Sequence, residues 1–313
     1  MNGFDGISIN QVSVDYDFFV NGVSYIGNPR NNTVMYVSKK VENLIVCLHN
    51  VKECLIFVED GIYIPEDLYK ENCFIHSSNP QKDYAKFVNQ FGELKRENNR
   101  KRRYNYNREK GIWIGENVTI GDNAYIEPMV FIDHDVVIGD NAVVSTGSII
   151  RNAVIGNNFR CYEKALIGID SFNLAKDDEG NTFRIPSLGT IKIGDNVDVG
   201  ANCIIALAAT SVTEINDFSK IDANVVIGHD CKIGKNVEIA TNANLGGYVK
   251  VDDDTFIAMN VTVKNRVSIG KNCFVGIGSV VLRDILNEET VFGVPARKIR
   301  MQVEDDKYGK KRS

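Results

Sequence analysis

A six-residue repeat of branched aliphatic residues runs through most of the second half of the sequence. Counting in sixes from Ile215 gives Ile, Leu or Val at every position as far as Val281, and an earlier run begins at Ile114 and shifts by one residue after Ile150. Neither the helical period of 3.6 nor the strand period of 2 produces this spacing. A short fixed repeat predicts a solenoid, and three hexapeptides per triangular coil place residues eighteen apart about 4.8 Å from each other along the axis.

The composition excludes several classes of function. The chain has 313 residues and a net charge of −5, which argues against nucleic acid as its main partner. No apolar run is long enough to span a bilayer, and the amino terminus lacks the layout of a signal peptide. Seven cysteines occur without a C-x-x-C pair, as in a reduced protein. We therefore expect a cytoplasmic protein with no membrane span.

The sequence divides into four predicted parts. Residues 1–78 contain short apolar runs between Asn, Gly, Pro and charged residues, which indicates a small α/β domain. Residues 79–110 begin as a helix at Asn-Pro and end in a basic linker. Residues 111–285 carry the repeat, with a polar loop at 169–190, and residues 286–313 read as a cap and tail. The predicted fold is mainly β, a parallel β-helix preceded by a small α/β domain.

Two segments within this plan have open interpretations. The basic run from Lys95 to Lys110 is either a solvated helix end and linker or a patch that attracts the phosphates of an anionic substrate. A second, shorter break in the repeat falls at 206–214. Loops that project from a rigid scaffold often carry function, so both breaks in the repeat are of interest.

Several stretches resemble known enzymes. Residues 221–247 (IDANVVIGHDCKIGKNVEIATNANLGG) and 283–300 are similar to N-acetyltransferases of nucleotide-linked amino sugars. Residues 168–205 and the helix at 79–91 (NPQKDYAKFVNQF) resemble UDP-3-O-acylglucosamine N-acyltransferases of lipid A synthesis, which carry a uridine-binding domain before the β-helix. Both belong to the left-handed β-helix acyltransferases. The resemblance covers about residues 25–300 and implies a homotrimer with active sites between neighbouring prisms.

The chain departs from the lipid A enzymes at three places. Tyr36 matches their uracil-contacting aromatic residue, but Lys39 and Glu42 stand where Asn and Tyr would fall. Residues 206–208 (Ala-Leu-Ala) replace an acidic residue and arginine, and the terminal helices that bind acyl carrier protein have no counterpart. Residues 293–297 (Gly-Val-Pro-Ala-Arg) resemble users of coenzyme A instead. We therefore expect an acyl-CoA co-substrate and a short acyl group.

His229 is the predicted general base. Acyl transfer from a thioester to an amine requires removal of a proton and stabilisation of an oxyanion, and histidine accepts a proton near neutral pH. Gly247 lies eighteen residues later, one coil on, where a glycine lets a backbone N–H approach the thioester oxygen. The resemblance gives these two residues the same roles, and Asp230 matches an acidic residue that orients the imidazole or contacts the sugar. The alternative for His229 is a solvated side chain on a coil face.

Other residues are assigned to substrates with a structural alternative for each. Asp222 is expected near the sugar and Tyr36 against the pyrimidine, although Asp222 also fits a polar repeat position and Tyr36 a core position. Phe172 and Asn173 of the polar loop are expected to wall the pantetheine channel, with Asn173 assigned to substrate binding, although Phe172 also fits a loop anchor. Gly247, Ala296 and Arg297 are expected to bind coenzyme A, although Arg297 also fits a cap residue.

The remaining histidines are expected to be structural. His134-Asp135 has the same His-Asp motif as His229-Asp230, but the residue eighteen positions later is Asn152 and not a glycine. His134 therefore reads as structural or as the edge of a substrate site, with catalysis as the weaker alternative. His49 and His76 fall in the first domain. Zinc of the γ-carbonic-anhydrase type needs three convergent histidines, so no metal is predicted.

The expected function is that of an N-acyltransferase. It would move an acetyl or short acyl group from coenzyme A to the amine of a UDP- or dTDP-linked amino sugar. One alternative is a lipid A type N-acyltransferase whose donor is acyl carrier protein. Another alternative is a non-catalytic β-helix that acts as a scaffold or a sugar-nucleotide sensor. A further alternative is an enzyme that transfers the acyl group to a hydroxyl group and not to an amine.

Overall fold

The computed structural model describes residues 6–299 and begins with a small α/β domain. Its sheet has four parallel strands in the order β3-β4-β5-β6: β3 Gly22–Val23, β4 Thr33–Val37, β5 Leu55–Glu59 and β6 Cys73–Ser77. A short antiparallel pair, β1 Ile7–Ser8 and β2 Phe19–Val20, precedes the sheet. The 3-10 segments are Ile9–Gln11, Lys39–Asn50 and Glu66–Lys70. Helix α1 packs against one sheet face through Tyr84 and Val88, whereas Ile45 and Leu48 of the second 3-10 segment pack against the other.

Helix α1, Pro80–Lys101, begins where the sequence predicts. The Asn79 side chain accepts a hydrogen bond from the Lys82 N–H at 3.1 Å, and Pro80 occupies the first turn, where its missing N–H has no cost. Tyr84, Val88 and Phe91 are buried on one side of the helix.

The rest of the chain is a parallel β-helix with three faces, which confirms the predicted fold class. The first face contains β7 Asn105–Asn107, β8 Ile112–Ile114, β11 Phe131–Ile132, β14 Ile149–Ile150, β17 Leu166–Ile169, β22 Ile204–Ala206, β25 Val226–Ile227, β28 Asn244–Leu245, β31 Thr262–Val263 and β34 Val280–Val281. The second face contains β9 Thr119–Ile120, β12 Val137–Ile138, β15 Ala153–Ile155, β20 Thr190–Ile193, β23 Val212–Ile215, β26 Lys232–Ile233, β29 Lys250–Val251 and β32 Ser268–Ile269. The third face contains β10 Tyr125–Ile126, β13 Val143–Val144, β16 Arg160–Cys161, β21 Asp198–Val199, β24 Lys220–Ile221, β27 Glu238–Ile239, β30 Phe256–Ile257, β33 Phe274–Val275, β35 Thr290–Phe292 and β36 Arg297–Lys298.

The repeated aliphatic residues form the interior of this prism. In the regular coils each residue pairs with the one eighteen positions later, as Ile227 does with Leu245. The one-residue shift in the repeat is a coil of seventeen, in which Ile138 pairs with Ile155. The two breaks in the repeat are longer coils, because Ile167 pairs with Ile205 and Ile205 pairs with Ile227. Both insertions leave the prism at the corner between the first and second faces.

Left-handed residues turn the chain at the corners. Asn occupies most of these positions, as at Asn224 and Asn242, because its short polar side chain tolerates a positive φ. Three successive coils depart from asparagine at the corner between the first and second faces. Asp230, Tyr248 and Arg266 hold φ values of 58°, 63° and 66° there.

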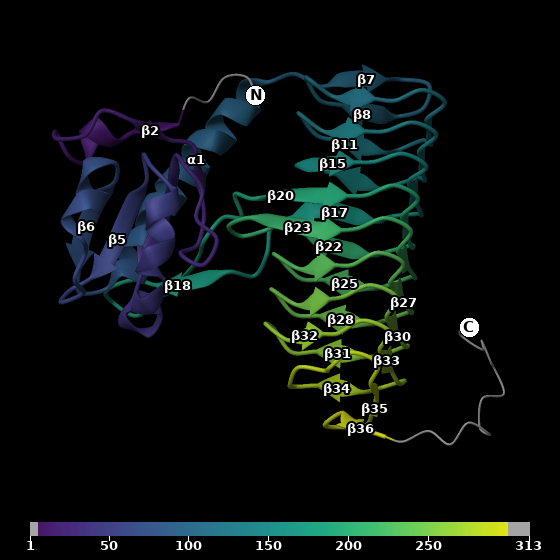
Figure 1. Cartoon of the computed structure of the whole chain (residues 1–313). Coiled ribbons are helices and arrows are strands. Elements are labelled where there is room, and N and C mark those ends of the chain that lie inside the picture. The colour runs from purple at the N-terminus through teal and green to yellow at the C-terminus, as the bar shows by residue number, and fades with distance from the viewer. Residues whose placement is uncertain (1–5, 300–313) are drawn as a thin grey trace.

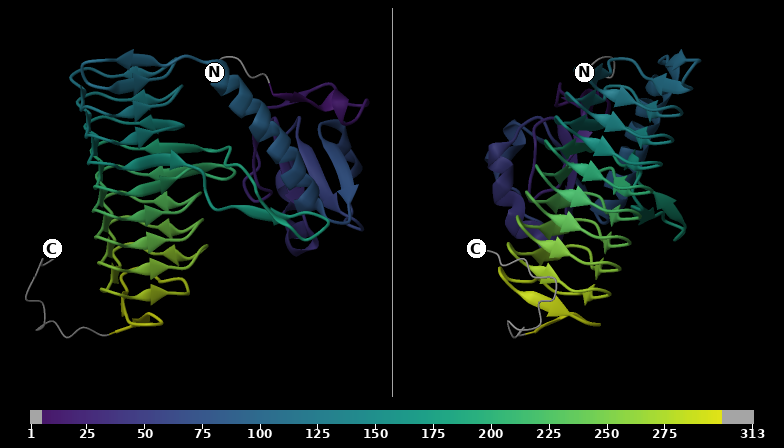
Figure 2. Two further views of the ribbon diagram at one scale, coloured as in Figure 1. Left: turned by 180° about the vertical axis from the view of Figure 1, so that it is seen from behind. Right: turned by 90° about the vertical axis from the view of Figure 1, so that its right-hand side faces the viewer.

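The α/β domain lies beside the β-helix, and both the linker after α1 and the polar loop join the two parts (Figures 1 and 2). After α1 the chain crosses to the first coils, where Arg102 pairs with Glu116 and Asp135. This part of the basic run therefore docks on the β-helix and does not form an open patch. The polar loop after β17 forms a hairpin, β18 Leu174–Lys176 and β19 Thr182–Arg184, that reaches back to the α/β domain.

The carboxyl end of the described chain closes the prism. Strand β35 continues the third face in parallel with β33, and β36 turns back antiparallel to β35. Ala296 donates its N–H to the Val280 carbonyl at 2.8 Å. Residues 300–313, which include the tail predicted at the end of the sequence, lie outside the described residues.

Candidate active site

His229 and Gly247 lie one above the other at the corner between the first and second faces, here called the His229 corner. His229 follows β25 and Gly247 follows β28 in the next coil, and the Tyr248 N–H donates to the His229 carbonyl at 2.8 Å. A Cβ atom added to Gly247 would lie 2.5 Å from His229 Nε2. The glycine therefore leaves open the space immediately beside the ring nitrogen.

Asp230 fixes the other side of the imidazole. Its Oδ2 atom lies 3.0 Å from His229 Nδ1, and the side chains of His229 and Asp230 are 22% and 3% exposed. A carboxylate at this distance favours the tautomer with a proton on Nδ1. That tautomer leaves a free lone pair on Nε2, the nitrogen that faces Gly247 and solvent.

Residues 206–211 form a cradle for Asp230. The carboxylate accepts hydrogen bonds from the Ala209 N–H at 2.8 Å and the Ser211 N–H at 3.0 Å. Burial alone would raise the pKa of Asp230, but the hydrogen bonds from His229, Ala209 and Ser211 lower it below its ordinary value. The short break in the repeat therefore supplies backbone donors, and its Ala-Leu-Ala stretch, 206–208, is buried.

The Gly247 N–H is available for a ligand. Within residues 6–299 it donates to no protein acceptor. An amine held beside Nε2 would transfer a proton to His229, while the Gly247 N–H would face the oxygen of a thioester. This corner can therefore supply both a base and an oxyanion donor.

Aromatic side chains of the α/β domain approach the same corner. Tyr25 meets the edge of Tyr248 with ring centroids 6.4 Å apart, and Tyr248 meets His229 at 5.1 Å. The Arg266 guanidinium lies 4.3 Å from the centre of the Tyr248 ring. Tyr36 packs on Tyr84 at 5.2 Å; burial raises the pKa of Tyr36, and Arg266 partly offsets that rise. Tyr36 is therefore on the side of its domain that faces the His229 corner.

Other predicted site residues lie elsewhere in the chain. Asp222 follows β24 at the corner between the third and first faces, where it accepts hydrogen bonds from the Thr241 hydroxyl and the Ala223 N–H. Phe172 is exposed beneath the Arg184 guanidinium, and the Asn173 carbonyl accepts the Ile185 N–H at 2.9 Å within the loop hairpin.

The two residues expected to meet coenzyme A are at the end of the prism. Ala296 and Arg297 lie at β36, whereas His229 lies three coils earlier on the first face. Arg297 Nη1 donates to the Ala296 carbonyl at 3.1 Å. A single chain therefore groups His229, Asp230 and Gly247 and brings Tyr36 towards them. Asp222, Ala296 and Arg297 lie at other corners or coils, and Phe172 and Asn173 belong to the polar loop that leaves the same corner two coils earlier.

Tyr248, Arg266 and the backbone donors of the cradle were not predicted from the sequence. For Tyr248 and Arg266, their positions in the repeat could have indicated a special role. Both occupy corner positions at which asparagine usually stands in this chain. The left-handed backbone conformation costs more free energy for an aromatic residue or an arginine than for asparagine.

His134 forms a separate, closed arrangement. Its Nδ1 atom accepts the Glu116 N–H at 2.8 Å, and the Tyr104 ring covers it with centroids 4.4 Å apart. Burial, followed by the charge of Arg102, lowers the pKa of His134. Its Nε2 atom is buried with no hydrogen-bond partner among the described residues. His134 is thus enclosed by the linker that follows α1.

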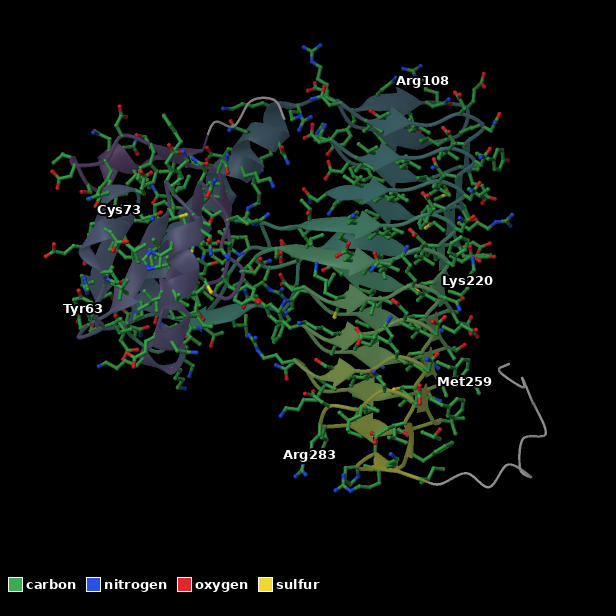
Figure 3. All side chains as sticks on the ribbon, in the orientation of Figure 1. Tyr63, Cys73, Arg108, Lys220, Met259 and Arg283 are labelled. Atoms are coloured by element: carbon green, nitrogen blue, oxygen red, sulfur yellow. The ribbon has the colours of Figure 1, made fainter. Side chains whose placement is uncertain are left out.

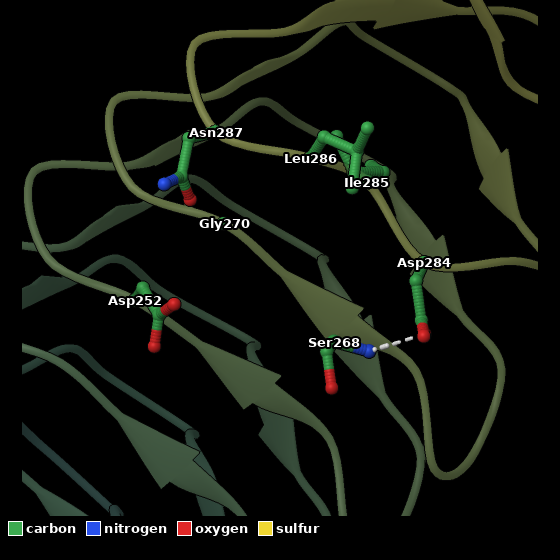
Figure 4. A pocket seen from close by; sticks show the side chains of 7 residues that line it. All are labelled: Asp252, Ser268, Gly270, Asp284, Ile285, Leu286 and Asn287. Carbon is green, nitrogen blue, oxygen red and sulfur yellow. Dashed lines mark hydrogen bonds between the residues drawn. The ribbon is translucent and has the colours of Figure 1, made fainter.

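The remaining histidines and surface features lie away from this corner. His49 pairs with Asp67 at 3.2 Å, and His76 shares a hydrogen bond with Tyr69. A shallow polar pocket near the carboxyl end is lined by Asp252, Asp284 and Asn287, with Ser268 donating its N–H to Asp284 (Figure 4).

Within residues 6–299, no helix is long and apolar enough to cross a membrane. No three His, Cys, Asp or Glu side chains converge in this range in a way that could hold a metal ion.

Two family models match the repeats. The model described as bacterial transferase hexapeptide (six repeats) matches residues 117–152 and 213–247. The model described as hexapeptide repeat of succinyl-transferase matches residues 190–228 and 266–282.

Curated proteins with similar sequences include two sugar N-acyltransferases. UDP-3-O-acylglucosamine N-acyltransferase 2 of Legionella pneumophila (strain Paris) is 34% identical over 150 residues, which are 48% of this chain and 43% of the relative. UDP-3-O-acylglucosamine N-acyltransferase of Rhizobium meliloti (strain 1021) is 32% identical over 156 residues, 50% of this chain and 44% of the relative. The chain thus spans less than half the length of these two relatives.

Similar solved structures also include acyltransferases. The UDP-N-acetylglucosamine acyltransferase from Campylobacter jejuni has a TM-score of 0.55 and 25% identity, over 60% of this chain and 72% of that one. The Arabidopsis UDP-N-acetylglucosamine acyltransferase has a TM-score of 0.53 and 26% identity, over 60% and 65%.

Proposed function

Because this chain belongs to the hexapeptide-repeat, left-handed β-helix acyltransferase family, we propose that it transfers an acyl group from a thioester to the amine of a UDP-linked amino sugar. The observation that carries the proposal is the position of Gly247 opposite His229 Nε2, with Asp230 bonded to Nδ1. This pairing leaves a base and an oxyanion donor on neighbouring coils.

The proposed reaction begins with attack of the neutral amine nitrogen on the thioester carbonyl carbon, and His229 Nε2 takes one proton from that nitrogen as the carbon–nitrogen bond forms. The Gly247 N–H stabilises the negative oxygen of the tetrahedral intermediate. The carbon–sulfur bond breaks, and His229 returns the proton to the leaving thiolate. Asp230 stabilises the imidazolium while it exists, because its own carboxylate stays ionised in the cradle.

The acceptor and the donor are separate parts of the proposal. The curated relatives are named for a UDP-linked glucosamine, which favours UDP over dTDP. Their similarity also favours the lipid A type of reaction, with an acyl carrier protein as donor, over the coenzyme A reaction expected from the sequence. Coenzyme A stays the second candidate because residues 293–297 carry the Gly-Val-Pro-Ala-Arg sequence.

A donor screen tests the proposal. The purified full chain is incubated with a UDP-linked amino sugar and either acyl carrier protein thioesters of several chain lengths or acetyl-CoA. Mass spectrometry of the sugar product distinguishes amide from ester, and therefore transfer to an amine from transfer to a hydroxyl group. We expect His229→Ala to lower kcat by at least about 10²-fold, as for loss of a general base.

The rival classes give different results. A sensor or scaffold would bind a UDP sugar by calorimetry without turning over any thioester. Product formation by His229→Ala at the wild-type rate would contradict the assigned base.

A further inference from the structure

We propose that the α/β domain positions the catalytic base, with Tyr248 and Arg30 as the positioning residues through which it acts. This inference rests on the proposed function, and it assigns a second task to a domain otherwise expected only to recognise the nucleotide. Two independent sets of contacts lead from the α/β domain to His229 and Asp230.

The first set passes through the Tyr248 ring. Tyr248 lies between Tyr25 of the α/β domain and the His229 imidazole, nearly perpendicular to both, at interplanar angles of 73° and 84°. Edge-to-face contacts of this kind fix the orientation of a ring. Because the Tyr248 ring borders the imidazole that Asp230 holds from the other side, it limits rotation of His229.

The backbone of Tyr248 is consistent with a specific task. Its φ of 63° places an aromatic residue in the left-handed region, where asparagine stands at Asn224 and Asn242. Such a conformation costs roughly 1–2 kcal/mol for a residue other than glycine, asparagine or aspartate. Strain of this sort persists where the surroundings hold it, often at functional sites.

The second set passes through Arg30 and Thr210. The Arg30 guanidinium donates to the Thr210 carbonyl at 2.9 Å and to the Val23 carbonyl of its own domain at 2.8 Å. Thr210 belongs to the cradle, and its hydroxyl lies 3.3 Å from Asp230 Oδ1. Arg30 therefore joins the α/β domain to the segment that holds Asp230.

The two sets meet at one pair of residues. Tyr248 limits the imidazole directly, and Thr210 links Arg30 to Asp230, which is hydrogen-bonded to that imidazole. A ligand that immobilises the α/β domain would therefore also immobilise the base. Removing either contact should loosen His229 while leaving its chemistry intact.

The test compares Tyr248→Ala, Tyr248→Phe and Arg30→Met with the wild-type full chain. We expect Tyr248→Ala and Arg30→Met to lower kcat roughly ten-fold, less than the 10²-fold that a misplacement of 1 Å can cause. The KM for the thioester should stay unchanged. Tyr248→Phe keeps the ring that contacts Tyr25 and His229 and loses only the hydroxyl, so it should recover most of the kcat lost in Tyr248→Ala.

NMR of histidine-labelled protein supplies a readout that does not depend on turnover. The chain has four histidines, so the imidazole signals can be assigned by substitution. The His229 signal should shift or broaden in Tyr248→Ala and Arg30→Met, and the His49 and His76 signals should not. Arg160→Met on the third face and Tyr63→Ala, at the far side of the α/β domain in Figure 3, are the matched controls.

The outcomes separate this inference from the proposed function. If the wild type turns over no thioester, the proposed function fails, and the His229 signal alone decides the inference. If kcat and the His229 signal in both variants match those of the controls, the α/β domain does not position the base. Thermal unfolding excludes a folding defect, and Tyr248→Phe provides the conservative variant should Tyr248→Ala not fold.

Discussion

At the scale of single residues, the candidate site depends on one missing side chain. Gly247 is required because a Cβ atom there would lie 2.5 Å from His229 Nε2. Real Cβ atoms do not approach that closely, so the imidazole would have to rotate away from Asp230. The same substitution leaves the backbone N–H of residue 247 in place.

We therefore expect Gly247→Ala to lower kcat by about 10²-fold, because the base is displaced by roughly an ångström. Steady-state kinetics with the donor found in the screen measure this loss. The matched control is Gly22→Ala, whose added Cβ would meet Thr33 Cγ2 at an ordinary 3.6 Å. Wild-type turnover by Gly247→Ala would show that Nε2 is not the working nitrogen.

The residue scale also shows what sequence can and cannot predict. The pairing of His229 with Gly247 follows from counting eighteen residues, because each inward aliphatic side chain fixes the register. The same counting separates Asp222 from His229. The two residues are seven positions apart, which is about one hexapeptide, and one hexapeptide leads from one corner of the prism to the next. The contacts of Arg30 and Tyr25 with the His229 corner were not predictable, because they depend on how two domains pack.

At the scale of elements, the linker after α1 encloses His134, and this has a consequence for pH. The pKa of His134 is lower in the folded chain than its ordinary value near 6.5. Between the two values the unfolded chain binds more protons than the folded one, so the free energy of unfolding decreases as pH falls below about 6.5.

His134→Asn should weaken this dependence. The Asn Oδ1 atom can accept the Glu116 N–H in place of Nδ1, but it does not titrate in this range. Urea unfolding at pH 7.5 and 5.5 should show a smaller loss of stability in the variant than in the wild type. Equal losses in the two proteins would mean that another group titrates.

Helix α1 and the polar loop are joined at a second element contact. A Cβ atom added to Gly92 of α1 would lie 2.5 Å from Pro186 Cγ in the loop. Replacing glycine by alanine inside a helix normally stabilises it by up to about 1 kcal/mol. Here we expect Gly92→Ala to destabilise the chain by about 1–3 kcal/mol, because overpacking outweighs propensity.

Denaturant unfolding checks the sign of this change, with Glu97→Ala on the exposed side of α1 as the control. A stabilising Gly92→Ala would mean that the loop does not press on the helix. The sequence of this loop indicates only a polar excursion, because its two core residues, Ala175 and Ile185, are separated by a mostly polar and charged stretch. Only the packed structure reveals that the hairpin belongs to the core of the α/β domain.

At the scale of the whole molecule, the three faces of the prism differ in their outward residues. The first face presents Ile149, Leu166, Ile204 and Val226 on successive coils, whereas the second presents Lys192, Glu214 and Lys232 in the corresponding part. An outward apolar row on one face is suited to contact with another copy of the chain.

We therefore expect the homotrimer predicted from sequence, with a mass three times the 34.9 kDa of one chain by light scattering. Leu166→Lys should lower this mass, because it places a charge in the apolar row, whereas Thr119→Lys on the second face should not. A wild-type chain that stays monomeric at high concentration would contradict the assembly.

Because the prism is built of similar coils, its length can change without a change in the proposed catalytic site. Within the described residues, the strands of each coil pair with strands of the coil before it and the coil after it, and the proposed site occupies the few coils between the cradle and Arg266. Duplication or deletion of eighteen residues nearer the carboxyl end would change the length by about 4.8 Å and leave the catalytic corner as it is. Evolution can therefore vary the reach of this molecule in whole steps, by copying a short stretch of gene, without rebuilding the machinery that performs the reaction.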